Sequence, residues 1–340
     1  MPGGMMKAFE VQKFGLESLT LAERPDPQAG PGQVVIKLRA ASLNYRDLMM
    51  VQGSYNPRQR LPLIPLSDGV GEVSAVGEGV TRVKVGDRVA GNFTQRWIAG
   101  EPTRARLGAS LGGPLDGMLA EYNVLHEEGV VHVPAHLPDE EAATLPCAAV
   151  TAWHALIHQG RLKAGDTVLV QGTGGVSIFA LQFGVMAGAR VIITSSSDEK
   201  LERARSLGAA ECINYKANPD WDKAARELTG GVGVDHVVEV GGAGTLVKSL
   251  RATRVGGSVY VIGVLAGNAT ELNVTSILMQ NIRVQGILVG SREMFEAMNR
   301  AVELHQMRPV VDRVFSFEAA GEAFGYLASG AHFGKICIKF

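Results

Sequence analysis

Short apolar runs alternate with longer helical patterns through the middle of the chain. Uninterrupted apolar runs are typical of strands that are buried on both faces of a sheet. Strands that are apolar throughout or in large part are predicted on this basis at residues 168–170, 190–194, 212–214, 234–240 and 257–263. Helices are predicted for the segments between them, residues 176–187, 197–207 and 220–228. Because strands and helices alternate at the spacing of βαβ units, this region predicts a doubly wound α/β fold with a parallel sheet.

The chain before this region has a different texture. Residues 7 to about 148 carry short predicted strands at 34–38, 71–76 and 88–90, separated by turn signals rich in glycine. Residues 139–160 predict a helix that leads into the α/β region. The pattern changes again near residue 287. The elements predicted there are a helix at 292–304, a strand near 313–315, a helix at 318–329 and a final strand at 335–340.

Composition limits the possible classes of protein. The 340 residues are 46% hydrophobic with a net charge of −1, which fits about two globular domains and argues against disorder and general nucleic-acid binding. The cysteines Cys147, Cys212 and Cys337 lie too far apart to suggest a disulfide framework. Because there is no apolar signal core and no run of roughly 18 apolar residues, we expect no membrane association and a cytoplasmic protein.

A glycine-rich turn follows the first strand of the α/β region. The turn contains Gly172, Gly174 and Gly175, and Val176 then opens an apolar helix. A turn of this kind lets the backbone approach a pyrophosphate, and the start of the helix supplies N–H donors and a partial positive charge. Ser177 stands where the dinucleotide fingerprint has its last glycine. The following strand, at βαβ spacing, still favours a dinucleotide site.

Several short motifs follow one another along nearly the whole chain. They are Gly77-Glu78-Gly79-Val80, Val85-Gly86-Asp87-Arg88-Val89, Thr151-Ala152-Trp153, Gly172-Thr173-Gly174-Gly175-Val176, Leu207-Gly208-Ala209 and Gly334-Lys335. In this order they resemble the medium-chain dehydrogenase/reductase superfamily. The resemblance implies a GroES-like, β-rich catalytic domain in residues 1–148, a Rossmann NAD(P)-binding domain in 149–286 and a return segment, 287–340, that completes the catalytic domain. It also implies a homodimer joined edge to edge through the nucleotide-domain sheet, with residues 282–288 as the candidate edge strand.

The zinc positions of that superfamily are changed in this sequence. Zinc alcohol dehydrogenases of the superfamily bind the catalytic metal through Cys, His and Cys with a nearby Glu, and the matching places here hold Asn44, Ser67, Cys147 and Asp68. A catalytic zinc needs about three protein ligands. The stretch 91–119, which matches the lobe that holds a structural zinc, has no cysteine. We therefore expect no zinc, and Cys147 is interpreted as a small buried residue.

Cofactor choice is predicted from the end of the second α/β strand. NAD-specific folds place an acid there, and this chain has Ser195, which can donate to a 2′-phosphate that a carboxylate would repel. Lys200 and Tyr215 match positions that resemble phosphate contacts in quinone-reductase relatives. Asp198 and Glu199 add negative charge and count against this choice. We expect NADPH over NADH. The other expected cofactor contacts are Ser196, Gly241, Gly263, Lys335 and, at the nicotinamide, Thr151.

The absence of a Lewis acid changes the expected chemistry. Without a metal, nothing lowers the pKa of an alcohol, whereas adding hydride to an activated C=C bond or a quinone needs only donors for the developing oxyanion. Asn44, Asp47 and Tyr55 resemble pocket residues of the quinone oxidoreductase and enoyl reductase branch. Asn44 is expected to hold the carboxamide or substrate oxygen, and Tyr55 to donate a proton or hydrogen bond, with Tyr45 as a second candidate. Arg46 replaces the hydroxyl proton relay of the zinc enzymes.

These observations predict a zinc-independent, NADPH-dependent reductase that acts on small molecules, either quinones or α,β-unsaturated carbonyls. One alternative is an alcohol dehydrogenase that uses side chains alone. Another, of a different class, is an NADPH-binding sensor or structural protein with little turnover. The set of predicted pocket residues favours an enzyme, because a scaffold would not need them.

Overall fold

The computed structural model describes residues 4–340, which divide into two compact units. One unit contains the chain up to Val150 together with Gly290–Phe340, and the other contains Thr151–Val289. The domain boundaries expected from the sequence fall after residues 148 and 286, whereas the two units divide after residues 150 and 289. None of the helices in the described residues combines the length and apolar character needed to span a bilayer.

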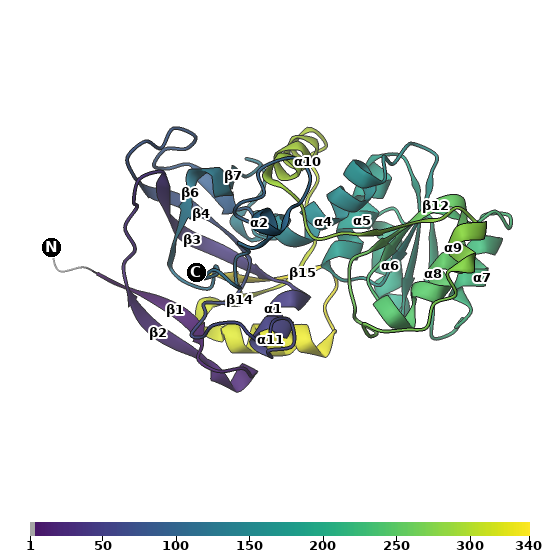
Figure 1. Ribbon diagram of the computed structural model, residues 1–340, viewed down its shortest axis with the longest axis horizontal. Helices are drawn as coiled ribbons and strands as arrows, with labels where there is room; N and C mark the ends of the chain where they lie inside the picture. Colours follow the sequence, from purple (N-terminus) through teal and green to yellow (C-terminus); the bar gives the residue numbers. More distant parts are fainter. Residues whose placement is uncertain (1–3) are drawn as a thin grey trace. The chain divides into compact units, whose positions relative to one another are not determined.

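The first unit is built on a mixed sheet with the strand order β14-β15-β3-β4-β5-β7, and β6 also pairs with β3 (Figure 1). Its strands are β14 (Val311–Ser316), β15 (Lys335–Lys339), β3 (Gln33–Leu43), β4 (Asp68–Val76), β5 (Arg88–Gly91), β7 (Val130–His132) and β6 (Tyr122–His126). A separate ribbon pairs β1 (Met5–Val11) with β2 (Leu19–Pro25). The helices are α1 (Tyr45–Val51), α2 (Arg104–Leu107), α3 (Asp139–Ala142), α10 (Arg292–Leu304) and α11 (Ala320–Ser329).

The C-terminal return completes this sheet. β15 runs antiparallel to β3, with Ile336 opposite Leu43 and Cys337 opposite Ser42. Its apolar side chains join the core of the unit, where Phe324 of α11 and Ile338 are fully buried. This pairing brings Lys335, the first residue of β15, beside the end of β3.

The second unit is a parallel sheet flanked by helices (Figure 1). Its strand order is β10-β9-β8-β11-β12-β13. Its strands are β8 (Thr167–Gln171), β9 (Arg190–Ser195), β10 (Glu211–Asn214), β11 (Val234–Glu239), β12 (Thr253–Val261) and β13 (Arg283–Gly286). The helices are α4 (Val150–Trp153, which begins one residue before the unit), α5 (Gly175–Met186), α6 (Asp198–Ser206), α7 (Trp221–Glu227), α8 (Leu246–Ala252) and α9 (Thr275–Met279). Counted from β8, this is the 3-2-1-4-5-6 order of the Rossmann fold. The fold class predicted from the sequence is confirmed.

Two predicted elements differ in detail. The segment expected to be one helix, 139–160, has a turn at residues 143–144, followed by π-helical turns at Leu145–Ala149 and His154–Gln159 around α4. Pro146 lies in the first of these turns and has no N–H for a regular helical bond. β12 begins at residue 253 instead of 257, and its pairing with β11 jumps between Val234 and His236, so the glycines near 256 lie in a bulge of the strand.

Candidate functional site

Residues 44–47 form a tight structure at the start of α1. The Asn44 N–H donates to Asp47 Oδ2 at 2.8 Å, as in the acidic half of a capping box. Asp47 is fully buried, and its Oδ1 accepts from Arg46 Nη1 at 3.0 Å. Asp47 therefore positions both Asn44 and Arg46. A role of Asp47 in catalysis stays a prediction, and this geometry favours an indirect one.

A buried polar cluster surrounds the Asn44 side chain. Lys335, only 3% exposed, donates through Nζ to the Leu43 carbonyl at 2.6 Å and to Asn44 Oδ1. Asn44 Nδ2 lies 3.4 Å from Ser67 Oγ, and the Ser67 hydroxyl donates to Asp68 Oδ1 at 2.7 Å. We refer to Asn44, Ser67, Asp68, Cys147 and Lys335 as the β3–β15 polar cluster. It contains the four positions that match a zinc site, where Cys147 is retained and the other three residues are changed, together with Lys335.

Burial raises the pKa of two acidic side chains in the β3–β15 polar cluster. Burial raises the pKa of the fully buried Asp68 to about 6, although the Lys335 charge and hydrogen bonds from Asn44 and Ser67 act in the opposite direction. Burial, reinforced by the Asp68 charge, raises the pKa of the Cys147 thiol well above its usual range. The thiol is thus protonated at neutral pH, and a metal could bind the sulfur only by displacing that proton. The Cys147 N–H donates to Asp68 Oδ2 at 3.2 Å, and the side chain is buried, as expected.

The donor set of the β3–β15 polar cluster does not fit a catalytic zinc. Zinc takes Cys, His and carboxylate ligands, and Asn44 and Ser67 offer an amide and a hydroxyl instead. The Lys335 ammonium bound to Asn44 would also repel a dication at that position. Residues 4–340 contain no group of three or more His, Cys, Asp or Glu side chains that could hold a metal ion.

The two candidate tyrosines differ in their surroundings. Tyr55 is 41% exposed, and the guanidinium carbon of Arg46 lies 5.0 Å from the centroid of its ring. Arg46 is buried and donates to the carbonyls of residues 111–113, at 2.9 Å in the case of Gly112. Tyr45, at the start of α1, is 46% exposed. The phenol of Tyr55 is therefore the better anchored of the two.

The glycine turn of the second unit has the geometry expected of a phosphate site. Gly172 adopts a φ of 71°, which favours glycine, and Gly174 precedes the first turn of α5. Leaving out adjacent residues, no described atom lies within 4 Å of where a Cβ would stand on either of them, so this side of the turn is open. Ser177 is buried and donates to the Gln171 carbonyl at 2.6 Å. A serine replaces the third glycine here by tying the helix back to β8.

The predicted contacts to a 2′-phosphate lie at the end of β9. Ser195 Oγ accepts the Ser197 N–H at 3.3 Å, a bond that uses an oxygen lone pair and not the hydroxyl hydrogen. Ser197 caps α6 by accepting from the N–H of Lys200, and the N–H of Tyr215 donates to the Ser195 carbonyl at 3.0 Å. Exposed Asp198 accepts from Asn214 at 2.7 Å, which directs its carboxylate toward β10. These hydrogen bonds bring the backbone of Ser195, Lys200 and Tyr215 close together, although Tyr215 is distant in sequence. The half-buried Ser196 follows Ser195.

A buried carboxylate that sequence reasoning missed organises the end of β11. Glu239 is fully buried, and its Oε1 accepts from the N–H groups of Gly241 and Gly242 at 2.8 and 2.9 Å. Its Oε2 accepts from Gln171 at 2.8 Å and from Ser249. The available signal was the acidic residue that follows the apolar pair Val237-Val238. The carbonyl of Glu239 also accepts from the Gly263 N–H at 3.3 Å, so the predicted cofactor residues Gly241 and Gly263 lie around it. Thr151, the first residue of this unit, is buried in α4.

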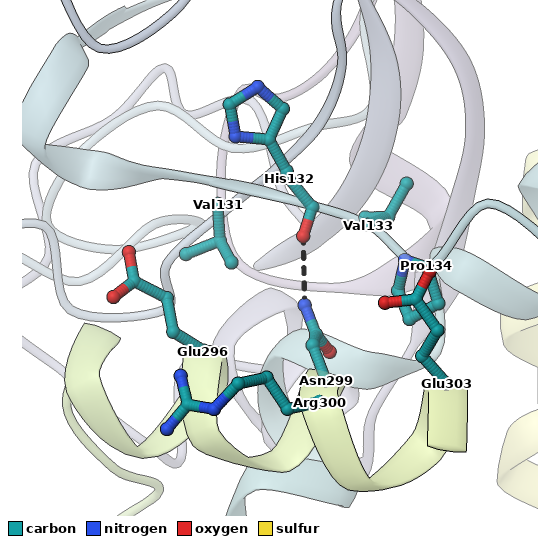
Figure 2. Close-up of a pocket in the computed structure, with 8 residues that line it drawn as sticks. All are labelled: Val131, His132, Val133, Pro134, Glu296, Asn299, Arg300 and Glu303. Atoms are coloured by element: carbon teal, nitrogen blue, oxygen red, sulfur yellow. Dashed lines mark hydrogen bonds between the residues drawn. The ribbon is translucent and has the colours of Figure 1, made fainter. Parts of the chain in front are cut away.

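A separate hollow of about 330 Å³ lies between β7 and α10 in the first unit (Figure 2). Its floor includes Asn299, whose Nδ2 donates to the His132 carbonyl at 2.9 Å. None of the site residues predicted from the sequence lines this hollow.

The chain matches known protein families over most of its length. Residues 30–135 match the alcohol dehydrogenase GroES-like domain, and residues 175–303 match the zinc-binding dehydrogenase family. A zinc-type alcohol dehydrogenase-like protein of Schizosaccharomyces pombe is 47% identical and covers 96% of each chain. An acryloyl-coenzyme A reductase of Metallosphaera sedula is 31% identical over 98% of this chain and 99% of its own. The crystal structure of a putative alcohol dehydrogenase from Sinorhizobium meliloti is 42% identical, with a TM-score of 0.94 and 100% of both chains covered.

These similarities agree with the two folds and with the glycine turn described above. The relatives are named as dehydrogenases and reductases, and the similarity extends through both units. The chain therefore belongs to the medium-chain dehydrogenase/reductase superfamily, as an NAD(P)H-dependent oxidoreductase.

Proposed function

We propose that this protein is a zinc-independent, NADPH-dependent reductase of α,β-unsaturated carbonyl compounds and quinones. The observation that carries the proposal is the composition of the β3–β15 polar cluster, where a lysine ammonium, an amide and a hydroxyl replace a zinc donor set. Reduction of an electron-poor C=C bond needs hydrogen-bond donors and no metal. The acryloyl-coenzyme A reductase relative acts, by its name, on an α,β-unsaturated thioester, which supports this substrate class.

Each predicted pocket residue has a role in this reaction. The reduced nicotinamide, when bound, supplies the hydride. Asn44 holds the substrate oxygen through its amide, and Tyr55 provides a proton or a hydrogen bond. Arg46 and Asp47 hold these two residues in place through the contacts described above.

The glycine turn and the end of β9 fit the cofactor. The open side of Gly172 and Gly174, at the N-terminus of α5, suits a pyrophosphate. Ser195 and Lys200 would read the 2′-phosphate, and Ser195 leaves no carboxylate at that position to repel it. This supports NADPH over NADH.

A homodimer is part of the proposal. β13 is an edge of the parallel sheet, and several apolar side chains at or near it are exposed, including Leu278, Met279, Val284 and Leu288. An open edge of this kind is suited to pairing with a second copy. A cytoplasmic location stays an expectation from the sequence.

Alcohol and aldehyde interconversion is the second candidate. It is favoured by the names of the alcohol dehydrogenase relatives. With Asn44 and Lys335 as the polar groups of the site, an alkoxide would have only hydrogen bonds to stabilise it.

The experiment that tests the proposal is a steady-state assay of NADPH oxidation. The purified protein is offered 2-cyclohexenone, crotonyl-coenzyme A, 1,4-benzoquinone and butanal in separate reactions, and NADP⁺ with butanol in the reverse direction. We expect turnover with the enone, the enoyl thioester or the quinone. Turnover confined to butanal and butanol would establish the second candidate instead.

A further inference from the structure

The Lys335 ammonium is buried, and its position is set by β15. The antiparallel pairing with β3 places Lys335 beside the end of that strand. Nζ then donates to the Leu43 carbonyl and to the side-chain oxygen of Asn44. This contact links β15 to Asn44, the residue that precedes α1.

The contact with Lys335 determines which way the Asn44 amide faces. An ammonium can only donate, whereas an asparagine amide has one accepting oxygen and one donating nitrogen. The oxygen must therefore face Lys335, and the nitrogen must face the opposite side. There the Asn44 side chain hydrogen-bonds Asp68, and Nδ2 lies 3.4 Å from Ser67 Oγ, at the limit of a hydrogen bond, so the N–H directed at Ser67 is only weakly engaged. The Lys335 ammonium, which contacts the amide oxygen, also polarises the amide and makes its N–H groups stronger donors.

We propose that Lys335 is a positioning residue for the reduction, which holds the Asn44 oxygen so that the Asn44 N–H donates to the carbonyl oxygen of the substrate. This inference rests on the proposed function. Bound NADPH would supply a hydride to the β-carbon of the enone and be left as NADP⁺, while the C=C electron pair would move to give an enolate. The α-carbon then takes a proton from water or from Tyr55. The Asn44 hydrogen bond strengthens as the enolate oxygen gains charge.

This role differs from the one predicted from the sequence, in which Lys335 contacts the cofactor. A cofactor contact would appear in NADPH affinity. A positioning role would appear in the maximal rate and would depend on the presence of Asn44. The two roles can therefore be separated by measurement.

The test uses Lys335→Met, which keeps the length of the side chain and removes the charge. We expect kcat for 2-cyclohexenone to fall about 10- to 100-fold, somewhat less than the loss of a direct oxyanion donor. The dissociation constant for NADPH, from fluorescence titration, should stay within about twofold. The matched control is Lys339→Met in the same strand, where the lysine is 65% exposed and pairs with Glu140, and it should leave kcat unchanged. A rise of tenfold or more in the NADPH dissociation constant would overturn the proposal.

A second set of variants tests whether Lys335 acts through Asn44. In Asn44→Asp the pairing with Lys335 is retained while the N–H donor is lost, so it should fold, bind NADPH and lose as much rate as Asn44→Ala. The double variant Lys335→Met/Asn44→Ala should be no slower than Asn44→Ala, because Lys335 affects the rate only through Asn44. If the rate losses of the two single variants multiply in the double variant, the proposal is overturned. An active wild type with an unimpaired Lys335→Met variant would refute this inference alone, and a wild type inactive on every enone and quinone would refute the proposed function as well.

Discussion

The guanidinium carbon of Arg46 lies 5.0 Å from the centroid of the Tyr55 ring. Arg46 is itself buried, bound to Asp47 and to the carbonyls of residues 111–113, and it also lies 5.3 Å from the ring centroid of Phe93. A cation held this firmly gives the ring a defined contact surface. Tyr55 is thus positioned by its ring, while 41% of the residue stays exposed.

Tyr55→Phe keeps the ring on Arg46 and removes only the hydroxyl. If the phenol supplies a proton or hydrogen bond, kcat for an enone should fall by roughly 10²-fold, the low end for general acid catalysis, because water can replace part of the effect. NADPH affinity should not change. An easily reduced quinone should lose less rate than the enone.

Tyr45→Phe is the matched control for this variant, because Tyr45 is similarly exposed and comes from the same segment. It should keep the wild-type rate. If Tyr45→Phe is the slow variant and Tyr55→Phe is not, then the donor is Tyr45.

The preference for NADPH predicts opposite effects of two changes near the end of β9. Ser195→Asp should erase or reverse the preference, because a carboxylate repels the 2′-phosphate. Lys200→Ala should weaken NADPH binding by about ten- to a hundredfold and spare NADH, since a hydrogen bond to a charged group contributes roughly 1.5–3 kcal/mol.

Fluorescence titration of both cofactors with both variants tests this. Lys223→Ala is the control, because Lys223 is an exposed lysine of the same unit that pairs with Asp220. Equal losses of NADPH and NADH in Lys200→Ala would mean that Lys200 does not recognise the phosphate.

The second unit was largely predictable from the sequence because its signals are local. Strands such as β8 and β9 are buried on both faces, so each appears as an apolar run next to a glycine or a polar helix. The edge strand near residue 283 and helix α10 were also predicted in place. β1, β2, β6 and β7 were not, because no apolar run in these strands is longer than two residues.

The interior of the site was less predictable because its contacts are distant in sequence. Lys335 and Asn44 lie 291 positions apart, and no local pattern indicates that they bond. Glu239 ends β11, and its five donors come from three separate segments. Arg46 was interpreted only as the loss of a hydroxyl relay, whereas in the structure it binds residues 111–113 and contacts Tyr55.

Metal analysis of the purified protein should find no stoichiometric zinc. Asn44 and Ser67 are poor ligands, and the Lys335 ammonium bound to Asn44 would repel a dication. Cys147→Ser should therefore keep nearly full activity, and chelators should not inactivate the wild type. One tightly held zinc per chain, lost together with activity in Cys147→Ser, would contradict the zinc-independent mechanism.

The exposed edge at β13 predicts a dimer in solution. Light scattering should give twice the chain mass of 36.1 kDa. Val284→Lys places a charge on this edge, where the side chain is 39% exposed, and should shift the equilibrium toward monomer. Val255→Lys, at an exposed valine in β12, is the control and should stay dimeric. A dimer that Val284→Lys leaves intact would require a different interface.

The buried Asp68 predicts how stability depends on pH. Its pKa is raised by burial from 3.8 to about 6, so the folded state binds a proton that the unfolded state has already released between these values. The stabilisation from this group is fully present below about pH 4 and is lost as pH rises through 6, by at most about 3 kcal/mol for a shift of this size. The free energy of unfolding in urea should therefore fall between pH 5 and pH 8 by more in the wild type than in Asp68→Asn, which cannot ionise. Asp220→Asn serves as the control, because the pKa of exposed Asp220 is lowered by its hydrogen bond and charge interaction with Lys223, and its titration is complete below this range. An identical pH dependence in the wild type and Asp68→Asn would show that the Lys335 charge and the surrounding donors keep Asp68 ionised throughout, in which case the β3–β15 polar cluster contains a true ion pair.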